Sequence, residues 1–547
     1  MKRKFMSKVF LLCLLALATG SVFAQKRLPG DKPKLIVQVV VGQMRADYLL
    51  RFKENLGNEG FKTLINEGAY CQNARYSYML TQTAPGLATI ATGASPSLHG
   101  IPSNSWYDRS SGVVREACYD SRATPLESNN DKLKRSPKNL LASTFGDELR
   151  LLNRKSKVVG VAMEPEEAIL LSGHNANAAY FFDEMSGKFV SVTSYMQYLP
   201  TWVSEFNNKK FADIYLSRGW ETLYQALEYE NYTPDSATLA RTPNGAKTPL
   251  SIVVGNAKKD AKRAYAQLRE LPYGDNLVKD FAVSAIVGEG LGKDRATDMI
   301  TIYFGALRNA GNSYGLQSVE LEDVFYRTNE NIKHLLTFLN DYVGKENYLL
   351  VLTSDHGANF SQKQLEAVGM PYGSFDHNKA LILLRSYLSI IYGKGDWVKA
   401  FAQKQIFLNH TLIDDSNLRL AEVQERAAYF MLQFSGVTAA VTAHTLANTT
   451  FTNGMMRAMQ NSFFQKRSGD IIISLEPGWV ETSSESAANS AYNYDTHVPL
   501  AFYGWRVKRK TISSPVDVTD IAPTLSTLVG IPLPNAASGR VITEVVE

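Results

Sequence analysis

Several stretches of the chain are continuously hydrophobic rather than alternating between apolar and polar residues. The clearest is Lys34–Val41, KLIVQVVV, which is rich in β-branched side chains. Runs of this kind are typical of strands that are buried on both faces of a parallel sheet. Similar runs predict further strands at Lys157–Met163, Asp298–Phe304 and Tyr348–Ser354, and shorter ones predict strands at Lys379–Leu384 and Asp470–Leu475.

Amphipathic segments lie between these runs, and the longest is Ser318–Tyr342, whose apolar residues recur at helical spacing. Alternation of strands and helices predicts the α/β class, with a mostly parallel central sheet and helices on both faces. Ligands of such sheets bind at the carboxyl ends of the strands. Gly42, Arg308 and the pair Asp355–His356 each follow a predicted strand, so we expect them at one edge of the sheet.

Two stretches break the strand–helix pattern, and we expect them to be insertions that cap the sheet. They cover approximately residues 182–288 and 376–477, within one large domain at 25–547. The tail carries the segment DIAPTLSTLVG, which predicts a helix with Pro523 in its first turns and Gly530 at its end.

Composition and charge exclude some classes of protein. The chain has 547 residues, 45% of them hydrophobic, which is enough for a large core. Its formal net charge is +5, and no long block of Lys or Arg occurs. We therefore expect no nucleic-acid partner.

The amino-terminal residues 1–24 read as a signal peptide. Lysines and an arginine precede the apolar run Val9–Ala18, and Val22-Phe23-Ala24 is a suitable cleavage site. No later segment is apolar enough to span a membrane, so we expect a secreted or periplasmic protein. The mature chain keeps Cys71 and Cys118, for which a disulfide and two buried free thiols are both consistent with the sequence.

The segment Tyr78–Gly93, YMLTQTAPGLATIATG, predicts a loop followed by a helix. Pro85 marks the first turn of this helix, so Thr83 lies where the loop meets the helix N-terminus. Free N–H groups and the helix dipole favour an anion there, and the hydroxyl of Thr83 is a candidate nucleophile. The simpler alternative is a capping threonine with no further role.

Five segments follow one another in the order found in the alkaline phosphatase superfamily. The chain most resembles its secreted single-chain bacterial alkaline phosphatases, which are related to the type I phosphodiesterases and nucleotide pyrophosphatases. The segments are TAPGLATIATG, SLHGIPSNSWYD, TSDHGA, YDTHVPL and TDIAPTLSTLVGIPLP. The resemblance implies an alkaline-phosphatase-like fold and a site in which two zinc ions clamp the attacking and leaving oxygens of a phosphate ester.

Five residues match the functional positions of that family. The resemblance implies that Thr83 is the nucleophile and that Asn104 donates to a phosphoryl oxygen. It also implies that Asp355 and His356 are ligands of the first metal and that His497 is a ligand of the second.

Other positions depart from the family. Its first aspartate falls on Gly42, and its later aspartate and histidine fall on Arg308 and Asn312. The lysine and arginine that grip phosphate in the monoesterase branch fall on Glu164 and Glu166. Too few ligands then remain for two tightly held zinc ions, so we expect zinc, if any metal, or no metal. One hypothesis is that Arg308 fills a vacated metal position, paired with Asp355, Glu164 or Glu166; the alternative is that it points to solvent.

These departures lead to two main interpretations. The first is an exported superfamily member with weak or no phosphomonoesterase activity, that is, a pseudoenzyme. The second is an active hydrolase of phosphate or sulfate esters that uses Thr83 with a single or rearranged metal site. A sugar- or peptide-binding envelope protein is a third class. The expected ligand is a small-molecule phosphate or related ester, and the oligomeric state stays open.

Overall fold

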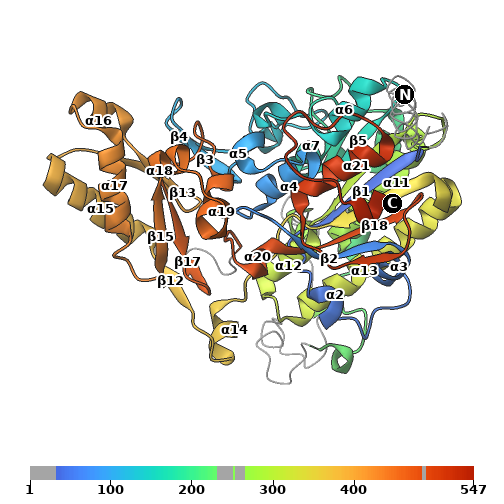
Figure 1. The fold of residues 1–547 in the computed structure, drawn as a ribbon. Coiled ribbons are helices and arrows are strands. Elements are labelled where there is room, and N and C mark those ends of the chain that lie inside the picture. Colours follow the sequence, from blue (N-terminus) through green and yellow to red (C-terminus); the bar gives the residue numbers. More distant parts are fainter. Residues whose placement is uncertain (1–31, 231–250, 253–264, 483–487, 547) are drawn as a thin grey trace, which may run out of the picture.

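The computed structural model describes residues 32–230, 251–252, 265–482 and 488–546, and within these residues its largest element is a ten-stranded sheet (Figure 1). The centre of this sheet is parallel: β1 (Leu35–Val41) pairs with both β10 (Asp298–Phe304) and β11 (Tyr348–Thr353). On the far side of β10 lie β5 (Val158–Ala162) and β6 (Ala178–Asp183), also parallel. The predicted α/β class and its four main strands are confirmed.

Antiparallel pairs occur toward both edges of the sheet. The strand order is β19-β2-β18-β11-β1-β10-β5-β6-β7, with β18 antiparallel to β11 and β7 antiparallel to β6. The outer strands are β2 (Ala69–Arg75), β18 (His497–Gly504), β19 (Lys510–Ile512), β20 (Val516–Asp517) and β7 (Lys188–Val190).

Helices cover both faces of this sheet. All seven residues of β1 are buried, with alternate residues packed into two separate hydrophobic cores. The first core is closed by α2 (Tyr48–Arg51), α3 (Phe61–Glu67), α8 (Thr201–Asn208), α9 (Phe211–Ser217), α11 (Tyr273–Glu289), α12 (Ala306–Tyr314) and α13 (Val319–Tyr342). The second is closed by α4 (Thr83–Thr92), α6 (Phe145–Leu152), α7 (Pro165–Ser172), α21 (Ile521–Val529) and α22 (Thr543–Val546).

The two helices predicted most clearly are present. Ser318 caps α13, because its hydroxyl accepts a hydrogen bond from the backbone N–H of Leu321 at 3.1 Å. In the tail, α21 ends at Gly530, which has φ 66°. Left-handed backbone of this kind is where glycine commonly ends a helix.

One predicted strand is wrong. Residues 379–384 lie inside α15 (His377–Tyr392), whose buried residues recur at helical spacing: Ala380, Leu381, Leu384 and Leu388. Asp376 starts this helix by accepting hydrogen bonds from the N–H groups of Asn378 and Lys379. The short apolar run therefore belonged to one face of a helix, which periodicity does not distinguish from a strand at this length.

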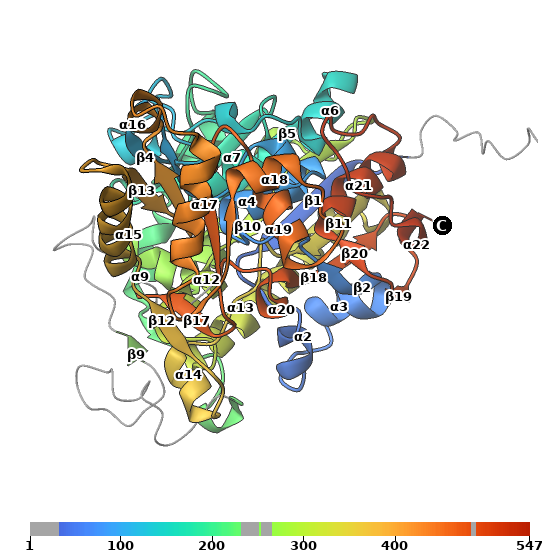
Figure 2. The ribbon, with the colours of Figure 1, turned by 60° about the vertical axis from the view of Figure 1, so that its left-hand side comes forward.

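A second, smaller sheet forms a lobe beside the main body (Figure 1), and this lobe comes to the front in Figure 2. Its antiparallel order is β13-β14-β16-β15, with β13 (Val398–Ala402), β14 (Gln405–Leu408), β16 (Ile471–Leu475) and β15 (Val437–Thr442). The strand predicted at Asp470–Leu475 is β16, in this sheet and not in the main one. Helices α15 and α17 (Leu420–Met431) share a third hydrophobic core with this sheet.

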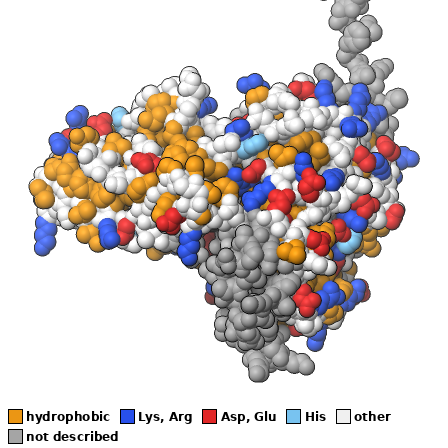
Figure 3. Space-filling view, turned by 90° about the horizontal axis from the view of Figure 1, so that it is seen from below, with side chains coloured by type: hydrophobic (Ala, Val, Ile, Leu, Met, Phe, Trp, Pro, Cys, Tyr) orange, Lys and Arg blue, Asp and Glu red, His pale blue; other side chains and the backbone are white. Residues whose placement is uncertain are grey.

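The predicted insertions remain predictions as units, but the structure shows where their described parts lie. Most of 376–477 builds the smaller lobe. In contrast, α8, α9 and α11 from 182–288 pack in the core of the main sheet, while residues 231–250 and 253–264 lie outside the described residues. Apolar side chains gather on the surface of the smaller lobe (Figure 3). Three apolar residues of α15, a helix of this lobe, are exposed: Ile382, Leu383 and Ile390.

The remaining elements are short. Two hairpin strands, β3 (Ser105–Asp108) and β4 (Val113–Glu116), follow α5 (Pro96–His99). The others include α14 (Gln362–Ala367), β12 (Gly373–Phe375), α16 (His410–Asp415), α18 (Ala443–Asn448), α19 (Gly454–Ser462), β17 (Trp479–Glu481) and α20 (Asn493–Thr496). Within the described ranges, no helix is both long and apolar enough to cross a bilayer. The predicted signal peptide at 1–24 lies outside those ranges.

A close contact brings α4 against the end of β11. A Cβ atom added to Gly86 would lie 2.2 Å from the backbone oxygen of Asp355. We therefore expect Gly86→Ala to lower the free energy of unfolding by about 1–3 kcal/mol, as overpacking does. Gly57→Ala is the matched control, because a Cβ there meets no atom within 4 Å. Urea unfolding of both variants tests this, and wild-type stability of Gly86→Ala would contradict it.

Candidate functional site

Thr83 is the first residue of α4 and lies where three central strands of the main sheet end. Gln82 precedes it in extended conformation, and Pro85 stands in the first turn as predicted. Gly42 follows β1, Asp355 and His356 follow β11, and Arg308 lies in the first turn of α12, just after β10. The structure thus brings these residues together at the predicted edge of the sheet.

The hydroxyl of Thr83 faces a histidine and an arginine. Its Oγ1 lies 3.5 Å from Nε2 of His356 and 3.4 Å from Nη1 of Arg308. The other ring nitrogen of His356, Nδ1, donates to the carbonyl oxygen of Gly357 at 2.7 Å. That bond requires a proton on Nδ1, so in the neutral imidazole Nε2 can accept a hydrogen bond from the threonine hydroxyl. Nε2 also lies 3.7 Å from Oδ2 of Asp355.

Asp355 is fully buried, and both of its oxygens accept hydrogen bonds from the protein. Oδ1 accepts from the backbone N–H groups of Gln43 at 2.8 Å and His356 at 2.9 Å. Oδ2 accepts from the hydroxyl of Tyr303 at 2.9 Å. The protein itself therefore supplies the donors that satisfy this carboxylate.

Tyr303, which no sequence motif indicated, fills the space beside Gly42. A Cβ atom built on Gly42 would lie only 2.3 Å from Tyr303 Oη and 2.9 Å from its Cζ. Tyr303 is the penultimate residue of β10, and β10 pairs with β1 so that Tyr303 lies opposite Val40. The available signal in the sequence was a tyrosine near the end of one predicted strand, β10, and a glycine directly after another, β1.

Arg308 has a different ion-pair partner from those that we expected. Its Nη1 forms an ion pair with Glu167 Oε1 at 2.8 Å and donates to Tyr303 Oη at 3.0 Å. The proposed partners Asp355, Glu164 and Glu166 are not the ones it pairs with. Glu167 lies three residues after Glu164 at the start of α7 and pairs with Arg308, whereas Glu164 pairs with Arg269.

Arg308 remains a cation in this environment. Burial alone would lower the pKa of its guanidinium, but Tyr303, Glu167 and Asp355 around it outweigh that effect and raise the pKa. Burial likewise raises the pKa of the Glu167 carboxyl, against the opposing charge of Arg308. A fixed positive charge therefore stands within hydrogen-bonding reach of the threonine hydroxyl.

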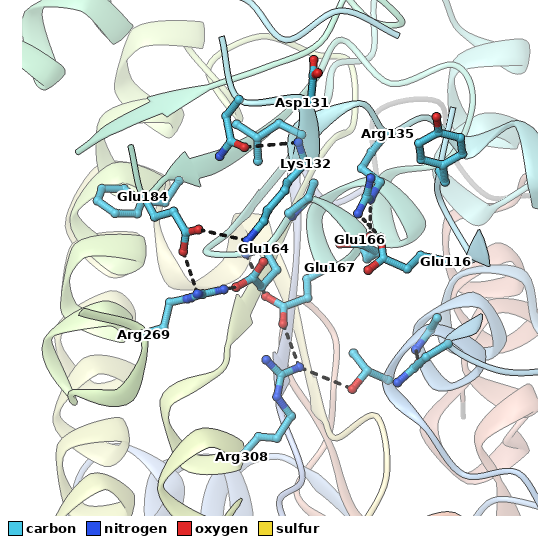
Figure 4. A pocket seen from close by; sticks show the side chains of 18 residues that line it. Glu116, Asp131, Lys132, Arg135, Glu164, Glu166, Glu167, Glu184, Arg269 and Arg308 are labelled. Atoms are coloured by element: carbon cyan, nitrogen blue, oxygen red, sulfur yellow. Dashed lines mark hydrogen bonds and ion pairs between the residues drawn. The ribbon is translucent and has the colours of Figure 1, made fainter. Parts of the chain in front are cut away.

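Glu164 and Glu166 line a cavity of about 690 Å³ beside Thr83 (Figure 4). Each of them is paired with an arginine that the sequence analysis did not foresee. Arg135 binds Glu166 at 2.5 Å, and Arg269 binds Glu164. These cations offset the negative charge of the two glutamates, although the cavity still carries more carboxylates than cations.

Of the remaining predicted site residues, Asn104 and Asn312 lie at the site, whereas His497 does not. Asn104 lines the site, with its Oδ1 accepting from the N–H of Ala84 at 2.8 Å, so its amide NH₂ is what it can offer a ligand. Asn312 lies one turn after Arg308 on α12 and lines the site too. His497, at the start of β18, instead donates from Nε2 to the carbonyl of Gln72 at 2.9 Å and does not line the cavity beside Thr83.

The described residues contain no group of three or more His, Cys, Asp or Glu side chains arranged to hold a metal ion. The two cysteines, Cys71 and Cys118, are buried free thiols, so the disulfide alternative is wrong. Burial raises the pKa of Cys71 to about 12. Such a thiol is inert at neutral pH.

Comparison with known proteins assigns the class. The family of type I phosphodiesterases and nucleotide pyrophosphatases matches residues 36–500. The chain belongs to this family, within the alkaline phosphatase superfamily.

Individual relatives agree. The chain is 34% identical to alkaline phosphatase PhoV of Synechococcus elongatus, over 99% of this chain and 100% of that protein. It is 34% identical to alkaline phosphatase PafA of Elizabethkingia meningoseptica, over 96% of this chain and 97% of that protein. The crystal structure of wild-type PafA has a TM-score of 0.88 at 32% identity, covering 95% of this chain and 100% of that one. Murine ectonucleotide pyrophosphatase/phosphodiesterase 5, at 13% identity and a TM-score of 0.53, shares the fold alone, over 91% of this chain and 95% of that one.

Asp275 of α11 fixes the helix that carries Arg308 and Asn312. Its Oδ1 accepts from the backbone N–H groups of Gly305 at 2.8 Å and Ala306 at 3.1 Å. Burial raises the pKa of its carboxyl to about 7. The carboxyl group is thus held at the start of α12 in an environment that favours its neutral form.

We expect Asp275→Asn to change how stability depends on pH. A folded-state pKa above the ordinary value gives a stabilising contribution that is complete below about pH 4 and is lost as the pH rises toward 7. Asparagine keeps the Oδ1 acceptor and does not ionise. The unfolding free energy of Asp275→Asn minus that of the wild type should therefore rise by about 3 kcal/mol between pH 4.5 and 8. An equal difference at both pH values in urea unfolding would contradict this.

Proposed function

We propose that this protein is an exported member of the phosphodiesterase family that binds a small ester anion at Thr83 without a two-zinc centre, and that its phosphomonoesterase activity is weak or absent. The observation that carries the proposal is the hydroxyl of Tyr303. It occupies the space of a side chain at Gly42 and donates to Asp355. The resemblance implies a zinc ion held between two carboxylates at this place. This chain instead has the neutral hydroxyl of Tyr303 and the guanidinium of Arg308.

The residues present do not fit a pair of zinc ions. Catalytic zinc is normally held by about three protein side chains, each with an electron pair free to coordinate the metal. Asp355 is satisfied by protein donors, His497 donates its Nε2 proton to a carbonyl, and Gly42 offers no ligand. Arg308 adds repulsion, since unit charges about 4 Å apart interact by about 4 kcal/mol at an effective dielectric near 20.

Three features beside Thr83 favour binding of an anion. Arg308 supplies a positive charge at 3.4 Å from Thr83, Asn104 offers its amide NH₂, and the N-terminus of α4 adds its dipole. The relatives PhoV and PafA are named alkaline phosphatases, which supports a phosphate or related ester as the ligand class. Export rests on the predicted signal peptide at 1–24.

A second candidate function is slow ester hydrolysis with Thr83 as the nucleophile. The contact between Thr83 Oγ1 and His356 Nε2 supports it, because a histidine acceptor beside a hydroxyl is the arrangement of a general base and its nucleophile. Arg308 would stabilise charge that develops on the threonine oxygen or the ester. This route needs no ligand from Gly42.

Zinc content and turnover separate these readings. We expect well below one zinc per purified chain by mass spectrometry. We also expect hydrolysis of p-nitrophenyl phosphate and bis-p-nitrophenyl phosphate to be roughly 10³-fold or more slower than by PafA assayed alongside, since losing one charge-stabilising group already costs about 10²–10³. Two zinc ions per chain with turnover that Thr83→Ala abolishes would overturn the proposal. Metal-independent turnover that Thr83→Ala abolishes would favour the second candidate.

Restoring the family's ligands provides the constructive test. The triple variant Gly42→Asp, Arg308→Asp and Asn312→His should still bind zinc poorly, because Tyr303 clashes with any side chain at position 42. Adding Tyr303→Ser removes the clashing ring and should raise zinc affinity by tenfold or more, a gain of about 1.4 kcal/mol. Equal zinc affinity in both variants, measured by calorimetry, would show that Tyr303 does not block the site.

A further inference from the structure

Another cavity, of about 680 Å³, lies at the edge of the main sheet opposite to Thr83. Among its lining residues, Arg154 precedes the start of β5, and His174 and Asn175 precede the start of β6. Because β5 and β6 are parallel, both starts lie at the amino edge of the sheet, whereas Thr83 lies at the carboxyl ends of the strands. The two cavities share no lining residue. We call this second one the arginine cavity.

Two arginines of this cavity have no carboxylate partner among the described residues. Arg150 lies in the last turn of α6, and Arg154 follows two residues after the helix ends. Nη1 of Arg150 donates to the carbonyl oxygen of Asn175. Its Nη2 and the whole guanidinium of Arg154 form no hydrogen bond or ion pair with a described residue. Burial lowers the pKa of Arg150, the direction expected of a cation that lacks a close counter-charge.

The one carboxylate in the described lining, Asp147, is neutralised by His174. Nδ1 of His174 lies 3.0 Å from Oδ2 of Asp147, and Nε2 lies 2.9 Å from the carbonyl oxygen of Leu140. Both neighbours only accept hydrogen bonds, so both ring nitrogens carry protons and the ring is an imidazolium. The hydrogen bond to Asp147 also raises the pKa of His174. These two charges cancel, and the lining keeps the two positive charges of its arginines.

The rest of the lining is neutral. Asn535 accepts from the backbone N–H of Ser143 at 2.9 Å with its Oδ1, so its amide NH₂ is what it can offer a ligand. Glu148, which accepts from the hydroxyl of Ser143 at 2.6 Å, does not line the cavity. Leu141 and Leu151 add apolar surface and are 51% and 67% exposed. The volume is within the range of about 300–1,000 Å³ that small organic ligands occupy.

We propose that the arginine cavity binds a small organic dianion, a phosphate monoester or a phosphonate that carries an apolar group. The guanidinium groups of Arg150 and Arg154 bind the oxyanion, because the planar fork of an arginine pairs with two phosphate oxygens at once. Leu141 and Leu151 contact the apolar group. The inference goes beyond the proposed function, since this cavity lies at the other edge of the sheet and involves no residue of the threonine site.

Calorimetric titration of the full chain at pH 8 tests the ligand class. The probes are phenylphosphonate, benzenesulfonate, which has the same ring with a single charge, and inorganic phosphate, which has no ring. We expect phenylphosphonate to bind tenfold or more tighter than either of the others. Benzenesulfonate binding as tightly overturns the requirement for a dianion, and inorganic phosphate binding as tightly overturns the role of the leucines.

Substitutions test the two arginines. Arg150→Gln and Arg154→Gln together should weaken phenylphosphonate by about tenfold for each arginine, as loss of a hydrogen bond to a charged group does. The matched control is Arg295→Gln with Arg509→Gln, which removes the same charge from two exposed arginines outside the described cavities. Should the Arg150 variant not fold, Arg154→Gln alone asks the question, since that side chain is exposed and has no partner among the described residues.

Diffraction separates this inference from anion binding at Thr83. Crystals soaked in p-bromophenyl phosphonate should show an anomalous bromine peak beside Leu141 and Leu151. A peak only beside Thr83, or equal affinity of the arginine variants and their control, overturns the inference and leaves the proposed function intact. A peak only in the arginine cavity supports the inference and counts against anion binding at Thr83. No peak at either place overturns both.

Discussion

The hydrogen bond from Tyr303 to Asp355 is the interaction on which the rest of the site depends. It links the ends of β10 and β11 across β1, and Gly42, which follows β1, leaves room for the ring. Because the tyrosine donates to one carboxylate oxygen and backbone N–H groups donate to the other, the buried charge of Asp355 is satisfied by the protein. Arg308 then completes the arrangement by joining Tyr303 to Glu167. Buried charges that are paired and hydrogen-bonded in this way need no metal to remain stable.

The two lobes meet at this same point. The main sheet presents Thr83, His356 and Arg308 at the carboxyl ends of its strands, as parallel sheets commonly present their ligand sites. The smaller lobe contributes the strained turn at Gln403 and Lys404, which reaches Gln82 at the N-terminus of α4. The site is therefore built from segments far apart in the sequence, and residues of both lobes line it.

Much of the fold was predictable because buried parallel strands have a local signature. The runs that became β1, β5, β10 and β11 were read from continuous hydrophobicity, and the motif order located Thr83, Asp355 and His356. The strand predicted at Lys379–Leu384 was wrong because a short apolar run on one face of a helix resembles a strand. The predicted ion-pair partner of Arg308 was wrong because the rotation of α7 about its axis decides which of the neighbouring glutamates faces Arg308. Tyr303, Arg135 and Arg269 were missed since their roles arise from contacts between distant elements, which carry no local pattern.

The central claim is that protein donors, not zinc, satisfy Asp355 beside Thr83. The most direct measurement is diffraction at the zinc absorption edge from crystals soaked in zinc. Our account predicts no anomalous peak near Asp355 and His356, with Tyr303 Oη still donating to the carboxylate. One or two strong peaks coordinated by these residues, with the tyrosine displaced, would contradict it.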